Sequence, residues 1–379
     1  MHPQPDSHAA ATGSQTSIGG KPMSANIDFH LAPLLVIWEA TRACALACQH
    51  CRASAEDVRD PRELSLEQGR KLIDDVAAMG TPLIVFTGGD PLQRDDLEDL
   101  VRHAVSRKLT VGAIPAATSR LTRERVISLR DAGVHQMALS LDGETAAKHD
   151  AFRRVDGTFE KVMEGARWIR EAGVPLQVNS VFGEWNFNDF DAMADLVTKL
   201  GIVFWEVFFL VPTGRGAALQ SCTSRQCEIL FAKLHKLAQT APFVIKVTEG
   251  QHYRRYLSQH GGIGPQGHPM NRAALSSKPV NSGCGFCFVD HLGNVCPSGF
   301  LPIECGNVKQ TSIIDIYRNS PVFKELRDFT KLKGKCGRCE YRDMCSGGSR
   351  ARAFSLTDDY MNSEPYCDYH PGPAASHAP

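Results

Sequence analysis

Residues 41–56 read T-R-A-C-A-L-A-C-Q-H-C-R-A-S-A-E and place three cysteines within eight positions, at Cys44, Cys48 and Cys51. A structural zinc site takes four protein ligands, so three thiols alone leave its tetrahedron incomplete. Iron–sulfur cubanes are normally held by four cysteine thiolates, and a cubane held by three keeps one iron open to another ligand. The spacing therefore predicts a cluster-binding loop with an open iron. A zinc loop and three buried thiols are the alternatives, because cysteine is often fully buried.

An alternating pattern surrounds this loop. From residue 34 to about residue 210, apolar strand-like runs alternate with amphipathic helical segments, which is typical of βα units on a parallel sheet. We predict six strands, at residues 34–38, 83–87, 109–114, 136–141, 176–182 and 203–210. We predict the helices between them at about residues 65–79, 97–108, 122–132, 158–172 and 188–200. Six units are too few to close an eight-stranded barrel, so we expect an α/β fold with an open, partial (β/α)6 barrel.

Local signals mark the ends of these helices and the segments that follow the barrel. Ser65 with Gln68 predicts a capping box, and Gly80 and Gly133 lie where helices end in a left-handed residue. A helix is expected at 224–240 and a strand at 243–248, whereas residues 258–283 are rich in Gly, Pro, Ser and Asn and predict a linker or lid. Residues 248–256 predict a surface helix, with substrate contact as the alternative.

The C-x3-C-x2-C loop directly after a strand resembles the signature of the radical S-adenosylmethionine superfamily. The resemblance implies a 4Fe–4S cluster on Cys44, Cys48 and Cys51, whose open iron binds the amino and carboxylate groups of S-adenosylmethionine. It also implies reductive cleavage of that cofactor to methionine and a 5′-deoxyadenosyl radical, which takes a hydrogen atom from the substrate. A reduced flavodoxin- or ferredoxin-type protein is the expected electron donor.

A glycine pair after the second predicted strand extends this resemblance. Gly88, Gly89 and Asp90, followed by a proline, resemble the G-G-E-P motif of the superfamily, with Asp in place of Glu. The motif implies that backbone carbonyls and the acidic side chain bind the methionine amino group. Consecutive glycines also allow a backbone to approach a ligand closely. A simple turn is the alternative.

Three further residues at later strands are implied contacts of S-adenosylmethionine. Ser140 ends the fourth predicted strand in S-L-D-G, Arg153 follows it, and Asn179 lies on the fifth strand. The alternatives are a turn, a solvated cation and a satisfied core amide. No residue is predicted as a catalytic acid or base, because hydrogen abstraction by a radical needs none.

Eight more cysteines form two groups in the C-terminal third. The first group is Cys284, Cys287, Cys296 and Cys305, and the second is Cys336, Cys339, Cys345 and Cys367. In a reducing compartment, such clusters favour metal binding over disulfides. The second group resembles the SPASM domain, over about residues 284–370, which implies one or two auxiliary iron–sulfur clusters.

One position departs from the SPASM pattern. Where the family continues with C-x3-C, this chain has Ser349, which replaces an expected ligand of the first auxiliary cluster. We therefore predict a cluster on the second group, whereas the first group has three possible roles: four ligands, three ligands with an open iron, or a zinc site. A zinc-ribbon-like module is the alternative for the whole region.

These motifs divide the chain into five parts. We predict a tail at 1–32, the radical S-adenosylmethionine core at 33–217, a connecting helix and linker at 218–283, the SPASM-like domain at 284–370, and a tail at 371–379.

Composition excludes several partners. The 42 basic and 42 acidic residues balance, so we expect no binding to nucleic acid or to an anionic membrane. No apolar run reaches the roughly 18 residues of a membrane-spanning helix, and the N-terminal segment lacks the apolar core of a signal peptide. We expect a cytoplasmic protein.

Short stretches favour one branch of the superfamily. The sequences G-K-C-G-R-C-E-Y-R at 334–342, R-A-R-A at 350–353 and V-I-W-E-A-T-R at 36–42 resemble the branch with S-adenosylmethionine-dependent haem synthase and haem d1 enzymes. That resemblance implies a tetrapyrrole substrate that loses propionate carboxyl groups as carbon dioxide. The alternatives are a maturase for a ribosomally made peptide and a non-catalytic zinc-bound scaffold.

Overall fold

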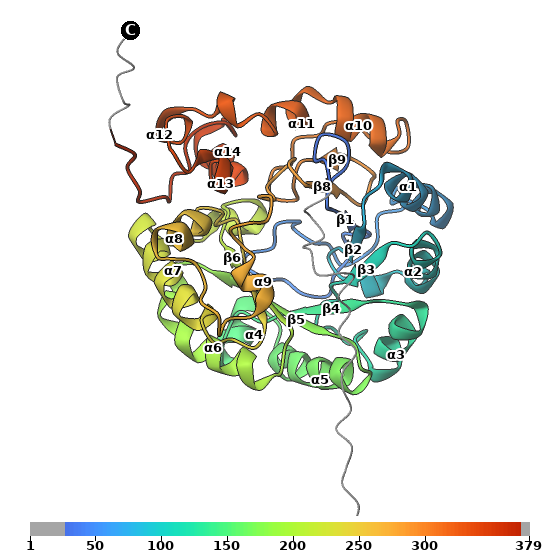
Figure 1. Ribbon diagram of the computed structural model, residues 1–379. Helices are drawn as coiled ribbons and strands as arrows, with labels where there is room; N and C mark the ends of the chain where they lie inside the picture. Colours follow the sequence, from blue (N-terminus) through green and yellow to red (C-terminus); the bar gives the residue numbers. More distant parts are fainter. Residues whose placement is uncertain (1–26, 373–379) are drawn as a thin grey trace, which may run out of the picture.

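The computed structural model describes residues 27–372, whose strands form one sheet enclosed by an outer layer of helices (Figure 1). Its nine strands lie in the order β7-β6-β5-β4-β3-β2-β1-β8-β9. Every neighbouring pair from β7 to β8 is parallel, and only β9 is antiparallel. The sheet is open, as predicted for a partial barrel. The strands are β1 (Leu35–Glu39), β2 (Leu83–Thr87), β3 (Thr110–Ala113), β4 (Gln136–Ser140), β5 (Leu176–Phe182), β6 (Phe204–Phe209), β7 (Val244–Thr248), β8 (Phe286–Val289) and β9 (Val295–Cys296).

The helices predicted between the strands are present, and α4 is an additional helix that was not predicted. They are α1 (Leu66–Met79), α2 (Leu97–Ser106), α3 (Arg123–Ala132), α4 (Ala146–Arg153), α5 (Thr158–Glu171), α6 (Phe190–Lys199) and α7 (Ser224–Ala238), with short 3-10 turns at Pro91–Gln93, Glu184–Asp189 and Gly214–Ala218. A further 3-10 turn lies later in the chain, at Phe329–Lys331. The capping box at Ser65 and Gln68 is confirmed, with both reciprocal hydrogen bonds present. Gly80 and Gly133 end their helices with φ of 90° and 103°, which favours glycine.

The side chains of β1 point alternately to the hydrophobic core beneath the outer helices and to the interior of the barrel. Val36 and Trp38 are fully buried between the sheet and the outer helices. A side chain at Gly69 of α1 would lie 2.6 Å from the Trp38 ring, so this helix position must stay small. Because side chains alternate along a strand, Ile37 and Glu39 face the other side, toward the interior.

The strand count of six was too low. β7 was predicted as a separate strand and joins the sheet, and β8 pairs in parallel with β1 on its other side. The four-residue β8 escaped prediction because it contains Cys287 and lies among cysteines and turns. As a result, the cysteine-rich C-terminal region contributes strands to the same sheet as the barrel.

The segments after β7 are packed against the barrel. They include α8 (Tyr253–Gln259) and α9 (Pro269–Arg272). Asn271 accepts a hydrogen bond from the Ile245 N–H at 2.8 Å and donates to the Phe243 carbonyl at 3.0 Å, so it covers the exposed edge of the sheet. Tyr253 is also buried. The surface helix predicted at 248–256 was therefore wrong, because this helix lies against the C-terminal segment.

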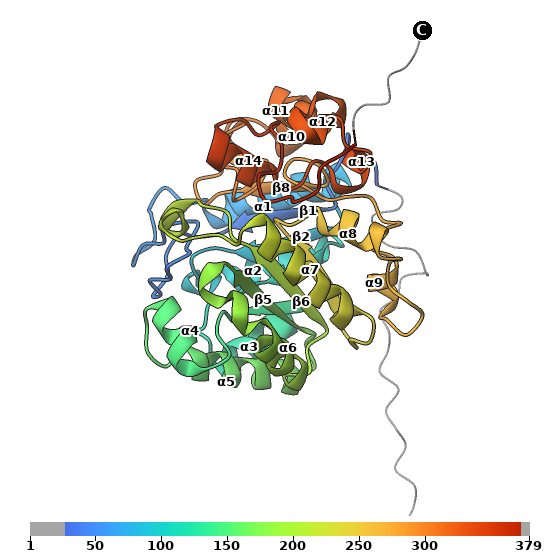
Figure 2. The ribbon, with the colours of Figure 1, turned by 90° about the vertical axis from the view of Figure 1, so that its left-hand side faces the viewer.

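The remaining helices lie together at one end of the molecule, above β1 and β8 in Figure 2. They are α10 (Ile313–Asn319), α11 (Pro321–Leu326), α12 (Gly334–Gly337), α13 (Arg342–Cys345) and α14 (Arg350–Thr357). Residues 1–26 and 373–379 of the predicted tails lie outside the described residues. Phe29, in contrast, is buried, and its carbonyl accepts hydrogen bonds from Tyr317 at 2.7 Å and Arg327 at 3.2 Å. Between residues 27 and 372, no helix is both long and apolar enough to cross a membrane.

Candidate functional site

The three-cysteine loop begins directly after β1 and packs as a small cluster at the carboxyl end of the sheet. Cys44 and Cys48 are buried and Cys51 is half-buried. Each sulfur accepts one N–H at 3.4 Å: Leu46 donates to Cys44, Arg153 to Cys48 and Ala55 to Cys51. Hydrogen bonds to the charged form of a group favour that form, so these donors suit thiolate ligands.

Burial has the opposite effect on the Cys44 sulfur when it carries a proton. Burial, together with the neighbouring Asp90, Cys48 and Cys51 and against the Leu46 N–H, raises the pKa of the Cys44 thiol to about 12. A coordinating metal deprotonates such a thiol outright. The loop thus fits an iron–sulfur cluster better than it fits free thiolates.

Arg215 ties the loop to the end of β6. Its guanidinium donates to the Cys48 carbonyl at 2.9 Å and to the Ala55 carbonyl at 3.3 Å, and its N–H donates to the Cys51 carbonyl at 3.0 Å. Gly214 has φ of 54°, and a Cβ there would lie 2.3 Å from the Arg52 carbonyl oxygen. Sequence reasoning missed Arg215, for which the only signal was the G-R-G turn after the sixth strand.

The two glycines after β2 face the same loop. A Cβ on Gly88 would lie 2.4 Å from the Thr41 carbonyl oxygen, and one on Gly89 would lie 2.4 Å from that of Arg42. The Gly89 N–H also donates to the Thr41 carbonyl at 2.8 Å. These glycines are therefore required by contact between two protein loops, in addition to the predicted approach of a ligand.

Asp90 is fully buried, and its carboxylate accepts hydrogen bonds from other parts of the protein. Its carboxylate accepts hydrogen bonds from the Thr118 hydroxyl at 2.7 Å, the Leu92 N–H at 3.1 Å and the Ala116 N–H at 3.3 Å. Burial nevertheless raises the pKa of the carboxyl. Among residues 27–372, no hydrogen bond uses the carbonyls of Gly88 and Gly89, so these carbonyls can accept from a ligand.

Ser140 and Asn179 lie on neighbouring strands, directly opposite each other in the sheet. Both side chains belong to the interior face. The Asn179 amide oxygen accepts from Gln177 at 2.7 Å, and Gln177 also donates to Glu206 at 2.9 Å. The two predicted contact residues are thus brought together, and Asn179 joins a row of polar groups across β5 and β6.

Arg153 is buried, and its environment differs from that of a solvated cation. One of its nitrogens pairs with Asp142, and another donates to Cys48 of the cysteine loop. Burial alone would raise the pKa of Asp142, but Arg153, with His50 and His149, lowers it. Arg153 therefore joins the end of β4 to a predicted cluster ligand.

A second buried ion pair joins the loop to the C-terminal region. Glu39, at the end of β1, accepts from Arg52 at 2.7 Å and lies 3.2 Å from the His291 ring. Burial opposes ionisation, but Arg52, His291 and Arg42 lower the pKa of Glu39 to about 2. Arg52 also donates to the Gly299 carbonyl at 3.4 Å. Sequence reasoning did not predict this bridge.

The four cysteines of the second group line one cavity. Cys336 and Cys345 are buried, and Cys339 and Cys367 are half-buried. The Glu364 N–H donates to the Cys336 sulfur at 3.4 Å. Four thiols around one cavity match the ligand number of a closed iron–sulfur cluster and that of a structural zinc site.

The cysteines of the first group have different surroundings from one another. Cys287, on β8, is fully buried, and burial together with the neighbouring Cys296 and Cys305 holds its pKa well above the usual range. Cys284 has other charged neighbours: burial raises its pKa to about 11, and Arg327 and Lys278 oppose the rise. Four ligands for one cluster in this group remain a prediction.

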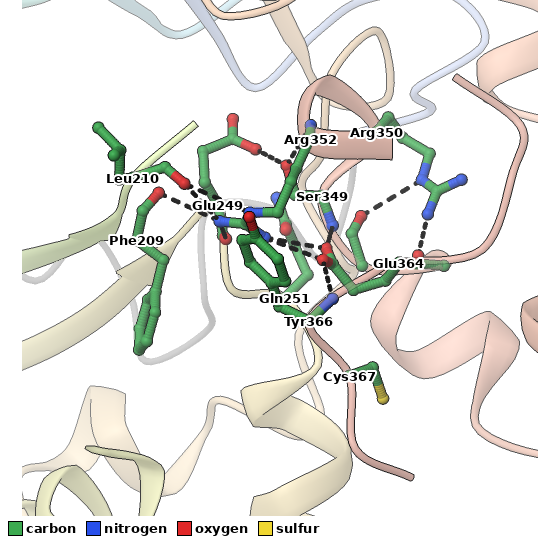
Figure 3. A network of polar contacts seen from close by, with 12 residues as sticks. Phe209, Leu210, Glu249, Gln251, Ser349, Arg350, Arg352, Glu364, Tyr366 and Cys367 are labelled. Atoms are coloured by element: carbon green, nitrogen blue, oxygen red, sulfur yellow. Dashed lines mark hydrogen bonds and ion pairs between the residues drawn. The ribbon is translucent and has the colours of Figure 1, made fainter. Parts of the chain in front are cut away.

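Ser349 has a structural role at the position of the expected cysteine (Figure 3). Its hydroxyl accepts the Arg352 N–H at 3.0 Å, which caps α14, and donates to the Glu249 carboxylate. Its own N–H donates to Glu364 at 2.6 Å. The hydroxyl thus holds the C-terminal helix to the segment after β7.

Arg352 completes this buried network. It pairs with Glu364 at 3.0 Å, and both side chains are almost fully buried. The same guanidinium donates to the carbonyls of Phe209, Leu210 and Glu249, as Figure 3 shows. One side chain therefore joins the end of β6 to both segments that shape the second cysteine cavity.

Comparisons with known proteins agree with this arrangement. The family model described as "Radical SAM superfamily" matches residues 38–197, and the one described as "Iron-sulfur cluster-binding domain" matches residues 282–340. An AdoMet-dependent heme synthase from Oleidesulfovibrio alaskensis is 37% identical over 98% of this chain and 96% of the relative. A PqqA peptide cyclase from Bradyrhizobium diazoefficiens is 28% identical over 89% of this chain and 87% of the relative. The crystal structure of Streptococcus suis SuiB bound to S-adenosylmethionine is similar in fold, with a TM-score of 0.69 and 14% identity over 89% of this chain and 78% of that chain.

Proposed function

This chain belongs to the radical S-adenosylmethionine superfamily, and we propose that it acts on a tetrapyrrole that carries carboxylate side chains. The chain is a radical S-adenosylmethionine enzyme with a 4Fe–4S cluster and auxiliary iron–sulfur clusters. The observation that carries the substrate proposal is the 37% identity to a heme synthase over 98% of this chain and 96% of the relative.

We assign the cofactor sites from the contacts around each group. Cys44, Cys48 and Cys51 hold the cluster that activates S-adenosylmethionine, and when bound this pair supplies a carbon radical able to remove a hydrogen atom. The free carbonyls of Gly88 and Gly89 accept the ammonium of the methionine part. Ser140 ends β4, Asn179 lies opposite it in the middle of β5, and Arg153 ends α4, the helix that follows β4. We assign these three residues to the rest of the cofactor.

The interior of the barrel suits a flat, acidic substrate. Phe208 of β6 lies 6.2 Å from Phe300 between ring centroids, and the Arg52 guanidinium lies 4.6 Å from the centroid of the Phe288 ring. Aromatic rings stack on a macrocycle. The Arg52 guanidinium is already engaged by Glu39 and the Gly299 carbonyl, whereas the half-exposed Arg42 lies 3.8 Å from Glu39 and can attract a carboxylate of the substrate. Arg42 comes from the cysteine loop, so it would place a propionate close to the reacting centre.

Conversion of a propionate side chain to a vinyl group is an oxidation, so an electron must leave the substrate. Loss of a hydrogen atom and of carbon dioxide from a propionate leaves a vinyl group and one surplus electron. The reaction therefore needs an electron acceptor, and cleavage of S-adenosylmethionine needs a donor. A reduced flavodoxin- or ferredoxin-type protein is the proposed donor.

A second candidate function is modification of a peptide. It is supported by the 28% identical PqqA peptide cyclase, which matches 89% of this chain. The heme synthase has the higher identity over more of the chain, so we rank the tetrapyrrole first.

The test is an anaerobic assay of the reconstituted protein. Dithionite and S-adenosylmethionine are supplied with and without Fe-coproporphyrin III, and 5′-deoxyadenosine, carbon dioxide and the porphyrin are quantified. We expect reductant-dependent 5′-deoxyadenosine, with porphyrin-dependent carbon dioxide and vinyl products. Cleavage that porphyrin does not change would contradict the tetrapyrrole proposal and favour the peptide.

A further inference from the structure

His252 is the most unusual polar residue near the second cysteine cavity. It lies between β7 and α8, its exposed fraction is 1%, and its side chain lines the cavity together with Cys336, Cys339, Cys345 and Cys367. Its ring packs edge-to-face with Phe231, with 4.8 Å between the centroids. This packing fixes the orientation of a buried, polar ring beside four thiols.

Neither ring nitrogen of His252 has a hydrogen-bond partner among the described residues. A buried polar group without a partner is costly, and each such group calls for an explanation such as a redox role or a bound ion. Burial lowers the pKa of His252 to about 3, with Arg352 and Arg255 acting in the same direction against Glu364. In either protonation state an imidazole carries at least one N–H donor, and no described residue accepts it.

Arg255 presents a second donor to the same cavity. Its two terminal nitrogens are used, one with Gln259 at 2.8 Å and the other with Glu228. Its Nε has no partner among residues 27–372 and is buried. The neighbouring Glu364 cannot take either donor easily, because it already accepts from Ser349, Arg352 and Tyr366.

We propose that His252, assisted by Arg255, donates an N–H hydrogen bond to a sulfur of the auxiliary cluster and thereby raises its reduction potential. This inference rests on the proposed ligand set of the second cysteine group. N–H groups directed at cluster sulfurs stabilise the more negative, reduced state, and hydrogen bonding to sulfur is one of the properties that set cluster potentials. His252 is thus a positioning residue for electron transfer, and the four cysteines remain the ligands.

The potential is measured by a redox titration followed by electron paramagnetic resonance on the reconstituted full chain. The cluster of the second cysteine group is recognised as the signal that S-adenosylmethionine does not change and that Cys367→Ala removes. For His252→Leu we expect unchanged iron and sulfide and a more negative midpoint potential. His252→Gln retains an N–H and should lie between the two, and His260→Leu, on an exposed ring at the end of α8, should match the unsubstituted protein.

A measurement without substitution covers the case in which His252→Leu does not fold. In protein labelled with 15N-histidine, pulsed resonance of the reduced auxiliary cluster should show weak coupling to one ring nitrogen. Strong coupling, or loss of iron in His252→Leu, would make the ring an iron ligand and overturn the proposal. No coupling, or an unchanged potential with full iron, would also overturn it. If the unsubstituted protein cleaves S-adenosylmethionine but has no signal insensitive to it, the ligand set itself has failed.

Discussion

The two thiol sites of this molecule are built in opposite ways. The barrel site takes Cys44, Cys48 and Cys51 from one short loop, whereas the C-terminal cavity collects its cysteines from positions 336 to 367. The first supplies three thiols and leaves an iron open for a cofactor. The second supplies four and can close the coordination of its cluster. A reactive centre is thus encoded locally, and its electron-transfer partner depends on how the distant chain segments pack.

The two sites also differ in the contacts that hold them in place. Arg215 and Arg153 hold the barrel loop mainly through its backbone and one sulfur. The C-terminal cavity depends on the buried Arg352–Glu364 pair and on Ser349. A substitution in the anchor of one site should therefore affect that site and leave the activity of the other unchanged.

Removal of one barrel thiol should have the largest effect. Cys44→Ala leaves two thiols for the cluster, and we expect no detectable 5′-deoxyadenosine in the anaerobic assay. Cys222→Ala, which removes a buried thiol of the hydrophobic core, is the matched control and should retain activity. A Cys44→Ala protein that still cleaves S-adenosylmethionine would contradict the assignment of the loop.

Removal of a thiol from the cavity should give a smaller, separable loss. In Cys367→Ala we expect iron to fall by about four atoms per chain, the content of one cubane, while the cluster of the barrel remains. Iron and sulfide analysis, together with cleavage of S-adenosylmethionine without substrate, measures both effects. Iron that stays at the level of the unsubstituted protein would contradict the ligand set.

The network in Figure 3 should matter for stability. Arg352→Met leaves Glu364 buried without its partner, and breaking a buried pair in this way costs about 3–5 kcal/mol of unfolding free energy. Urea unfolding of the reconstituted protein measures the loss. Arg102→Met, which breaks a pair with the exposed Asp99, should change stability by less than about 1 kcal/mol. Equal effects of the two substitutions would show that the buried pair is not the anchor.

The smallest effect is expected at the position that departs from the SPASM pattern. Ser349→Cys weakens the cap of α14, which costs about 0.5–2 kcal/mol for loss of a good capping residue, and leaves the iron content unchanged. Thermal unfolding and iron analysis test both statements. A gain of about four iron atoms per chain would show instead that the first cysteine group lacked only this ligand.

The elements that could be predicted from the sequence are those that depend on residues close together in the chain. The periodicities of strands and helices gave six strands in the right order, and the cap at Ser65 and the turn at Gly80 were confirmed because they depend on residues three or four positions apart. β8 was missed because it is short and its pairing with β1 joins segments about 250 positions apart, a contact that no local pattern carries.

The same limit applies to the site. The cysteine groups were evident from spacing, but their anchors were not: Arg215 contacts Cys48 across 167 positions, and Arg352 contacts Leu210 across 142. Asp90 was predicted as a ligand contact, and the structure adds that its carboxylate is held by Thr118. The unpaired ring of His252 could only be recognised once the cavity was known.

The most direct test of the contrast between an open and a closed cluster is electron paramagnetic resonance of the dithionite-reduced protein, recorded with and without S-adenosylmethionine. We predict that only the cluster signal lost in Cys44→Ala changes when the cofactor is added, while every auxiliary signal stays the same. A change in an auxiliary signal as well, or no change in any signal, would contradict the assignment of the one open iron to the barrel loop.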